Sequence, residues 1–154
     1  IPGRETFMSL RPESAGTYRG QCAEFCGASH ALMAFEVVAM EPDAFAAWLE
    51  AESEDAVPPE ASEAERGAEV FAREGCGGCH SVRGTEAVGQ VGPDLTHVGS
   101  RVSLGAGILG PTPEDFARWL GHTESLKPEV RMPTYDFLPP EDIAALAAYL
   151  EGLE

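Results

Sequence analysis

Two short segments of the chain hold side chains whose types and spacing suit metal or cofactor binding. The first, QCAEFCGASHALM at residues 21–33, places two cysteines, a histidine and a methionine within twelve positions. The second is CGGCH at residues 76–80. These segments hold all four cysteines as two close pairs. Such pairs fit metal or cofactor attachment better than a framework of disulfides across long loops.

The CGGCH segment has the C-x-x-C-H spacing of a c-type haem attachment site. One helical turn would put the thiols of Cys76 and Cys79 on the same side, where each can form a thioether with a vinyl group. The imidazole of His80 would then bind the iron. A redox C-x-x-C motif or half of a zinc site would use the same cysteines. The redox alternative calls for a strand-helix-strand setting, which the surrounding sequence pattern does not have.

Residues 22–33, which we call the ligand loop, offer soft to intermediate ligands. The thiols of Cys22 and Cys26, the imidazole of His30 and the thioether of Met33 together favour copper over magnesium or calcium. The spacing of the two cysteines is wider than in the usual C-x-x-C zinc knuckle, although zinc tolerates it. A disulfide between the two cysteines is the simple structural alternative.

The elements that must position these residues divide the chain into three zones. Residues 1–40 mix turn-forming residues with short β-like runs. A helix with an apolar face is expected at about 43–51. Residues 51–62 hold acidic residues and two prolines but little apolar surface, which predicts a semi-extended linker that cannot order itself.

Three helices are expected after the linker. Ser62 and Glu65 match a capping box at the start of the first helix, and Gly75 is placed to end it. Thr112, followed by a proline, predicts the start of the second helix. The third helix spans about 140–152 and has one apolar stripe.

The segments between these helices are long, glycine- and proline-rich loops at 84–111 and 121–139. Such loops are unusual in a compact domain unless something large fills its centre. Met132 is the only methionine after the linker, and its thioether could be a second axial haem ligand that favours reduced iron. The alternative for Met132 is a loop residue that caps the core. His97 and His122 could compete as ligands, but we expect them at the surface or beside the haem propionates.

The composition limits the function classes. The formal net charge of −16 would repel phosphate backbones, which argues against nucleic-acid binding. A cationic protein partner could be steered to this chain, although halophilic solubility or mere acidity would look the same. The longest apolar runs are far shorter than the ~20 residues of a membrane span, and no signal peptide is visible. Because the chain opens at Ile1 rather than Met, we expect a processed product or a piece of a longer protein.

Residues 63–154 resemble class I cytochromes c, which implies a mainly α fold around a covalent haem c. In that family a glycine and a phenylalanine on the first helix pack against the last helix, and Gly67 and Phe71 match them. The family's loop proline accepts a hydrogen bond from the proximal imidazole, and Pro93 matches it. The resemblance implies the following haem-site residues: Cys76, Cys79, His80, Met132, Pro93, Arg101 and Trp119.

The ligand loop and its flanks resemble the CuA domain of subunit II of haem-copper oxidases, a β cupredoxin-like fold with two bridged copper ions. The resemblance implies that Cys22 and Cys26 bridge the coppers, that His30 and Met33 each bind one, and that Glu24 contributes its backbone carbonyl. The family uses one further histidine upstream, and residues 1–20 contain none. We therefore expect only the C-terminal part of a CuA domain here and an incomplete copper site.

The complete layout resembles subunit II of caa-type cytochrome c oxidases. It implies the end of a CuA domain at 1–50, an acidic linker at 51–62 and a cytochrome c domain at 63–154. The implied function is electron transfer from a soluble donor, such as a cytochrome c, through haem c and CuA to the oxygen-reducing subunit I. The implied location is the periplasmic face of a bacterial inner membrane, with an anchoring hairpin upstream.

Three alternatives to this function stay open. The chain could be the electron-entry subunit of a nitric-oxide or nitrous-oxide reductase, since such a subunit could also pair CuA with haem c. It could be a stand-alone soluble c-type cytochrome. A non-redox module with a four-cysteine zinc site is also possible in principle, although His80 and the long loops argue against it.

Overall fold

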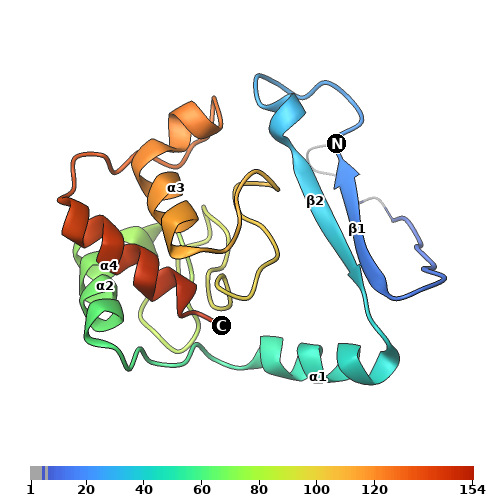
Figure 1. The fold of residues 1–154 in the computed structure, drawn as a ribbon, viewed down its shortest axis with the longest axis horizontal. Coiled ribbons are helices and arrows are strands. Elements are labelled where there is room, and N and C mark those ends of the chain that lie inside the picture. Colours follow the sequence, from blue (N-terminus) through green and yellow to red (C-terminus); the bar gives the residue numbers. More distant parts are fainter. Residues whose placement is uncertain (1–4, 6) are drawn as a thin grey trace.

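The computed structural model describes residue 5 and residues 7–154. Figure 1 shows a helical domain, residues 62–154, beside an N-terminal region that contains a two-stranded sheet and one helix. In chain order the elements are β1 (Gly16–Gln21), the 3-10 turn η1 (His30–Leu32), β2 (Ala34–Ala39), α1 (Pro42–Ser53), α2 (Ser62–Arg73), the 3-10 turn η2 (Cys76–Gly78), α3 (Pro113–Leu126) and α4 (Pro140–Glu151).

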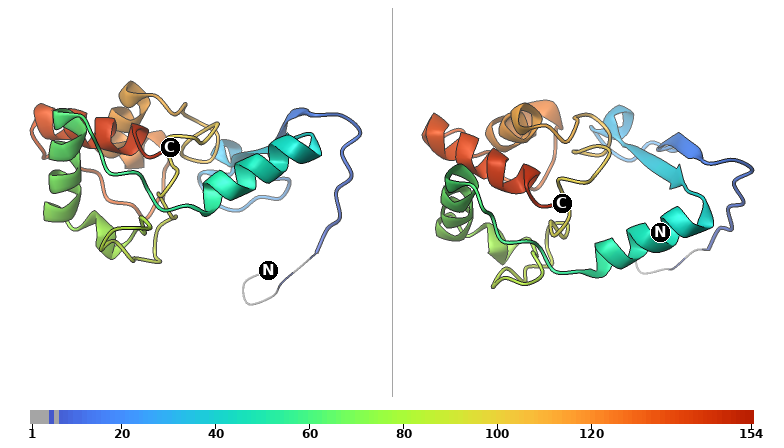
Figure 2. Two further views of the ribbon diagram at one scale, coloured as in Figure 1. Left: turned by 90° about the horizontal axis from the view of Figure 1, so that it is seen from below. Right: turned by 60° about the horizontal axis from the view of Figure 1, so that its bottom comes forward.

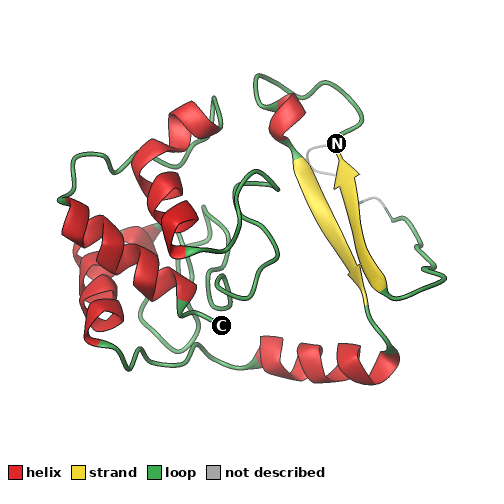
Figure 3. Ribbon diagram, in the orientation of Figure 1, coloured by secondary structure: helices red, strands yellow, loops and turns green. Residues whose placement is uncertain are grey.

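The helical domain is built around the crossing of α2 and α4. Gly67 permits the crossing because a Cβ at this position would lie 2.0 Å from the carbonyl oxygen of Ala145. The rings of Phe71 and Tyr149 meet edge to face beside it, with centroids 5.5 Å apart. The predicted pairing of the first and last helices is therefore confirmed. Figure 3 shows α3 packed above them and long loops filling the rest of the domain.

The helix boundaries confirm most of the predicted signals. The hydroxyl of Thr112 accepts a hydrogen bond from the amide of Asp115 at 3.2 Å, and Gly75 adopts a left-handed φ of 72° just after α2. The predicted capping box is wrong. Ala61 is the N-cap residue of α2, so Ser62 lies inside the helix and its hydroxyl caps no amide. The helix α3 also continues to Leu126 across a kink, into the segment predicted as a loop from 121.

The N-terminal region is an antiparallel hairpin followed by α1. The pairing of β1 with β2 runs from Gly16 opposite Ala39 to Gln21 opposite Ala34. The helix predicted at 43–51 is confirmed as α1, which is longer than predicted and spans Pro42–Ser53. No residue of α1 is buried. Figure 2 shows that this region lies alongside the helical domain and that α1 leads back to it. None of the described helices has the length and apolarity needed to cross a membrane.

Residues 54–61 form neither helix nor strand, but the start of this segment is held by the helical domain. The guanidinium of Arg83 donates to the carbonyl oxygens of Glu52 and Glu54, and the amide of Ala56 donates to the carbonyl of Arg83. His97 Nε2 donates to the Glu54 carbonyl at 3.1 Å. His97 is buried, so of its two expected places the surface is wrong, and a place beside the propionates stays a prediction. The predicted linker is therefore ordered at its start, by hydrogen bonds with residues of the helical domain.

Candidate functional site

The CGGCH segment folds as one tight turn on the edge of the apolar core. The amides of Cys79 and His80 both donate to the carbonyl of Cys76 at 3.0 Å. Both thiols are free. Cys76 packs partly against the core, and this burial raises the pKa of its thiol, whereas Cys79 is exposed. Two free thiols one turn apart, one facing inward and one accessible, fit covalent attachment of a group that lies on this surface.

The imidazole of His80 is fixed on one side by its neighbours. Its Nδ1 lies 2.8 Å from the carbonyl oxygen of Pro93, so Nδ1 carries the proton and donates a hydrogen bond to this oxygen. Nε2 is then available as a metal ligand. Gly92 leaves room for the ring, because a Cβ there would lie 2.4 Å from Cε1 of His80. This geometry fits a proximal haem ligand. Gly92 was not among the residues predicted from the sequence, although it directly precedes Pro93.

Met132 lies in the loop before α4 and packs partly against the core. The indole Nε1–H of Trp119 donates to its sulfur at 3.2 Å. Tyr135, further along the same loop, has its pKa raised by burial and by the neighbouring Cys76 thiol. The loop that carries Met132 therefore lies against the CGGCH segment. A partly buried thioether on this loop fits a second haem ligand.

The other candidate residues of the haem site lie as follows. Trp119 contacts Met132, and Arg101 donates to the carbonyl of Asp94 at 2.5 Å with its side chain exposed. The resemblance to class I cytochromes c implies that Arg101 and Trp119 meet the haem propionates, and this stays a prediction. His97 uses Nε2 to bind the Glu54 carbonyl, and His122 is exposed at the kink of α3. Because the Nε2 atom of His97 is engaged by that carbonyl and His122 is exposed, Met132 stays the preferred candidate.

The ligand loop brings its five expected ligand residues together around Cys26. The sulfur of Cys26 lies 3.5 Å from Cys22 Sγ, 3.7 Å from His30 Nδ1 and 3.8 Å from Met33 Sδ. Cys22 Sγ lies 3.2 Å from the carbonyl oxygen of Glu24. Both cysteines are free, and their sulfur separation is too long for a disulfide bond. The alternative of a disulfide between Cys22 and Cys26 is therefore wrong for this structure.

The register of the hairpin explains this cluster. Gln21 pairs with Ala34, so the next pair closes the loop, and the amide of Cys22 donates to the carbonyl of Met33 at 2.9 Å. Gly27, with a φ of 128°, turns the chain within the loop. The hydrogen bond with the Cys22 thiol is the main cause that raises the pKa of Cys26, followed by burial. A cation bound at this cluster would deprotonate the thiols that ligate it.

The donor set fits copper. Cys22, Cys26 and His30 place one ligand atom each within 4.8 Å of one another. Soft thiolate and thioether ligands beside an imidazole favour copper, and zinc is the main competitor. Within the described residues this cluster contains one histidine, one fewer than the CuA resemblance calls for. The cluster is also open to solvent, since the side chains of Cys26 and Met33 are exposed.

Comparison with known families finds a match for each of the two parts of the chain. The family model for cytochrome c matches residues 64–154, and the model for the periplasmic domain of cytochrome c oxidase subunit II matches residues 1–40. The predicted order, a CuA-type segment followed by a cytochrome c domain, is confirmed. The mainly helical domain after a short two-stranded sheet agrees with the predicted fold class.

Several curated relatives are similar to this chain. "Cytochrome c oxidase subunit 2" of Alkalihalophilus pseudofirmus is 39% identical over 154 residues, which is 100% of this chain and 44% of the relative. The protein of the same name from Bacillus subtilis is 34% identical over 97% of this chain and 43% of its own length. That from Cereibacter sphaeroides is 46% identical over only 50 residues, or 32% of this chain and 16% of its own length.

This chain spans less than half the length of the first two relatives. The match to the cytochrome c model covers more than half of the chain, and it includes the CGGCH segment, Pro93 and Met132. The chain therefore belongs to the cytochrome c family and carries, before this domain, a segment that matches the periplasmic domain of cytochrome c oxidase subunit II.

Proposed function

We propose that this chain relays electrons within a haem-copper oxidase. An external donor reduces a haem c in the helical domain, and the electron passes to a dinuclear copper centre at the ligand loop and on to an oxygen-reducing subunit. The observation that carries the proposal is the presence of two separate ligand clusters, one of haem type and one of copper type, in contacting parts of one chain. The names of the relatives support the same role.

The candidate haem-site residues of the helical domain divide the work of holding the haem. Cys76 and Cys79 would form the thioethers, and His80 and Met132 would bind the iron. A haem c held in this way supplies reversible one-electron transfer. The Pro93 carbonyl holds His80 in one tautomer and strengthens it as a ligand. No side chain is required as an acid, a base or a nucleophile, so oxygen reduction is assigned to another subunit.

The ligand loop would hold the copper centre through Cys22, Cys26, His30, Met33 and the carbonyl of Glu24. A further histidine from outside this loop would complete the ligand set. The match to a periplasmic domain supports a location outside the cytoplasm. We assign oxidase subunit I as the electron acceptor, a soluble protein such as a cytochrome c as the donor, and an upstream hairpin as the membrane anchor.

Absorption spectra and metal analysis test the proposal. We expect sharp bands of a low-spin c-type haem in the reduced protein, and one covalently attached haem with one iron per chain. Met132→Ala should lower the reduction potential and open the iron to added ligands, because the thioether favours ferrous iron. Met40→Ala, which changes a methionine outside both clusters, is the matched control. A protein that contains zinc without iron would contradict the proposal, and a Met132→Ala variant with wild-type behaviour would remove Met132 from the site.

A further inference from the structure

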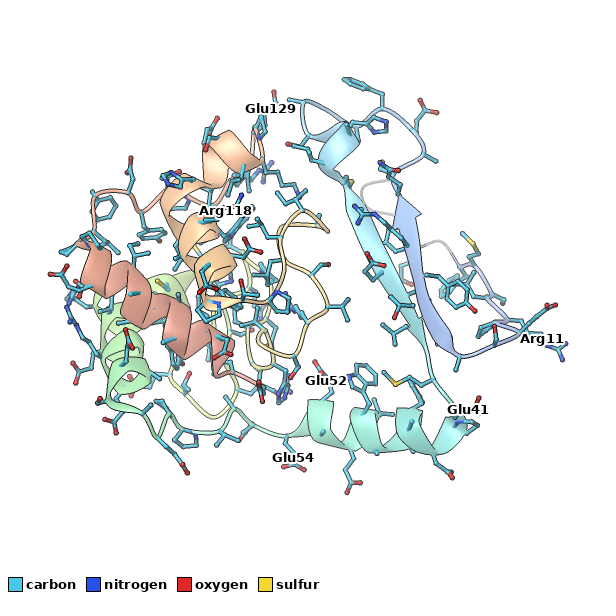
Figure 4. All side chains as sticks on the ribbon, in the orientation of Figure 1. Arg11, Glu41, Glu52, Glu54, Arg118 and Glu129 are labelled. Carbon is cyan, nitrogen blue, oxygen red and sulfur yellow. The ribbon has the colours of Figure 1, made fainter. Side chains whose placement is uncertain are left out.

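A loop of the helical domain contacts the ligand loop directly. The hydroxyl of Ser29 donates to the carbonyl oxygen of Pro128 at 2.5 Å, and the amide of Ala28 donates to the carboxylate of Glu129 at 3.3 Å. Figure 4 places Glu129 just beyond α3, facing the segment before β2. In sequence, Ser29 adjoins the copper-ligand candidate His30, and Pro128 precedes Met132 by four positions. The two candidate centres are therefore joined through a short stretch of bonded atoms.

A second loop of the helical domain contacts the hairpin beside the first contact. The amide of Ala34 donates to the carbonyl of Ala106 at 2.9 Å, and the guanidinium of Arg19 donates to the carbonyl of Gly107 at 3.2 Å. Ala34 is 6% exposed and is the one buried residue in the described part of the N-terminal region. Lys127 ties the two loops together, since its ammonium group donates to the carbonyl of Gly105.

Both loops adopt unfavourable backbone conformations at these contacts. Among the described residues, Ala106 and Glu129 are the two non-glycine residues with positive φ, at 66° and 64°. A side chain in this region crowds the following carbonyl, so the conformation carries an energetic cost. Costs of this kind persist where the surroundings fix the backbone for a purpose. Here each of the two residues bonds to the N-terminal region, Ala106 through its carbonyl and Glu129 through its carboxylate.

The ligand loop also faces this surface across a small gap. Cys26 and Met33 on one side, and Lys127 and Val130 on the other, line a shared cavity of about 160 Å³. A Cβ at Gly107 would lie 2.9 Å from the Cβ of Ala34, so only glycine permits the close approach of the second loop. Contacts on both sides of the candidate copper ligands thus hold one face of the cluster against the helical domain.

We propose that Gly105–Gly107 and Lys127–Val130 form a docking surface for the ligand loop of the same chain. The Ser29–Pro128 hydrogen bond would then be a bonded route for electrons between the two centres. One electron leaves ferrous haem iron, which becomes ferric, and reduces the oxidised copper centre; no proton or group moves with it. The electron route rests on the proposed function, whereas the docking contact rests on the hydrogen bonds alone.

Two variants test the docking surface in the full-length subunit. Ser29→Ala removes the hydroxyl that binds Pro128. Glu129→Gly removes the carboxylate that binds Ala28 and, at the same time, suits the positive φ, so the helical domain is not destabilised by backbone strain. The matched controls are Ser125→Ala and Glu124→Gln, which change an exposed serine and an exposed carboxylate on α3 outside the docking surface.

Amide hydrogen exchange measures docking without reference to any cofactor. We expect exchange at Ala28 and Ala34 to speed up about fivefold or more in each variant, because one hydrogen bond of the interface is lost. The control variants should exchange at the wild-type rate. Unchanged exchange in both Ser29→Ala and Glu129→Gly would overturn the docking proposal, whatever the metal content.

Flash reduction of the haem, followed by absorbance at the copper centre, measures the electron route. We expect transfer to slow by about fivefold or more in both variants, with unchanged haem and copper spectra. Faster exchange with unchanged transfer would keep the docking surface and overturn the electron route. Absence of the haem or copper spectrum in the wild-type subunit would overturn the proposed function and the electron route with it, while the exchange result would still decide the docking surface.

Discussion

Backbone carbonyls hold the ligand side chains of both clusters in place. The Pro93 carbonyl fixes His80, and the Glu24 carbonyl lies at the Cys22 thiol. Glu24 lies two positions from Cys22, whereas Pro93 lies thirteen positions from His80 and directly follows Gly92. The precision of the sites therefore depends on the local backbone as much as on the ligands themselves, and small residues beside the ligands are part of each site.

Gly92 is the sharpest test of this dependence. An alanine there would place its Cβ 2.4 Å from Cε1 of His80, so the ring or the loop must move. We expect Gly92→Ala to lower the free energy of unfolding by about 1–3 kcal/mol and to weaken the bond between His80 and the haem iron. Thermal unfolding and the absorption spectrum of the oxidised protein would measure the two effects.

Gly78→Ala provides the control within the same site. A Cβ at Gly78 would meet nothing within 4 Å, so this variant should keep the wild-type spectrum and stability. Equal behaviour of the two alanine variants would contradict the view that Gly92 makes room for the imidazole.

The sequence predicts the ligand residues of the two clusters better than it predicts the contact between the clusters. The ligand residues of each cluster lie within a few positions of one another, so their spacing predicts them. Ser29 and Pro128 are 99 positions apart, and neither has a side chain that indicates metal chemistry. Their contact depends on how the hairpin lies against the helical domain, and no local pattern encodes that.

The pairing of α2 with α4 is the element-scale feature that supports the haem site. Besides the contact at Gly67, two arginines of α2 bind one carboxylate of α4: Arg66 lies 2.5 Å and Arg73 lies 2.7 Å from the oxygens of Asp142. These hydrogen bonds, the one from Arg73 first, lower the pKa of Asp142. The ion pairs join the start of α4 to α2, the helix that leads into the CGGCH segment.

Asp142→Asn should therefore lower stability at neutral pH, by about 3–8 °C in the midpoint of thermal unfolding. Because the pKa of Asp142 is lowered in the folded state, its contribution is fully present above the unfolded-state pKa near 4. The contribution is lost as the pH falls through the lower folded-state pKa. The difference between wild type and variant should thus shrink in acid, which unfolding curves at several pH values would measure.

Glu141→Gln is the control for that experiment. It removes one negative charge from the same first turn of α4, but its side chain is exposed. A loss in Glu141→Gln equal to that in Asp142→Asn would assign the effect to the helix dipole rather than to the two arginines.

At this scale the sequence predicts helices well where the signals are local. Thr112 and Gly75 act as the patterns indicate, because capping needs only neighbouring residues. Ser62 does not, because the preceding segment approaches α2 so that Ala61 becomes the N-cap residue. The ion pairs of Asp142 could not be predicted either, since they depend on the angle at which two distant helices cross.

At the scale of the whole molecule, two connections among the described residues hold the N-terminal region against the helical domain. One is the docking surface at the ligand loop. The other is at the far end of the region, where Arg83 and His97 bind the carbonyls of Glu52 and Glu54. Figure 4 shows these two glutamates where α1 turns toward the helical domain. The acidic composition predicts a loose linker, but carbonyl groups at a helix C-terminus are good acceptors for a cation whatever the side chains.

Arg83→Ala tests this second connection. The variant removes the charged donor that binds the carbonyls of Glu52 and Glu54. The population of molecules in which the C-terminal end of α1 is detached from the helical domain should therefore rise about fivefold or more. We expect a broader distribution of distances between spin labels at exposed positions on α1 (Ala47) and α4 (Ala144). Pulsed electron paramagnetic resonance measures this distribution. Arg118→Ala, which removes an arginine paired with Asp115 on its own helix, should leave the distribution unchanged. An unchanged distribution in Arg83→Ala would mean that the docking surface alone fixes the two parts.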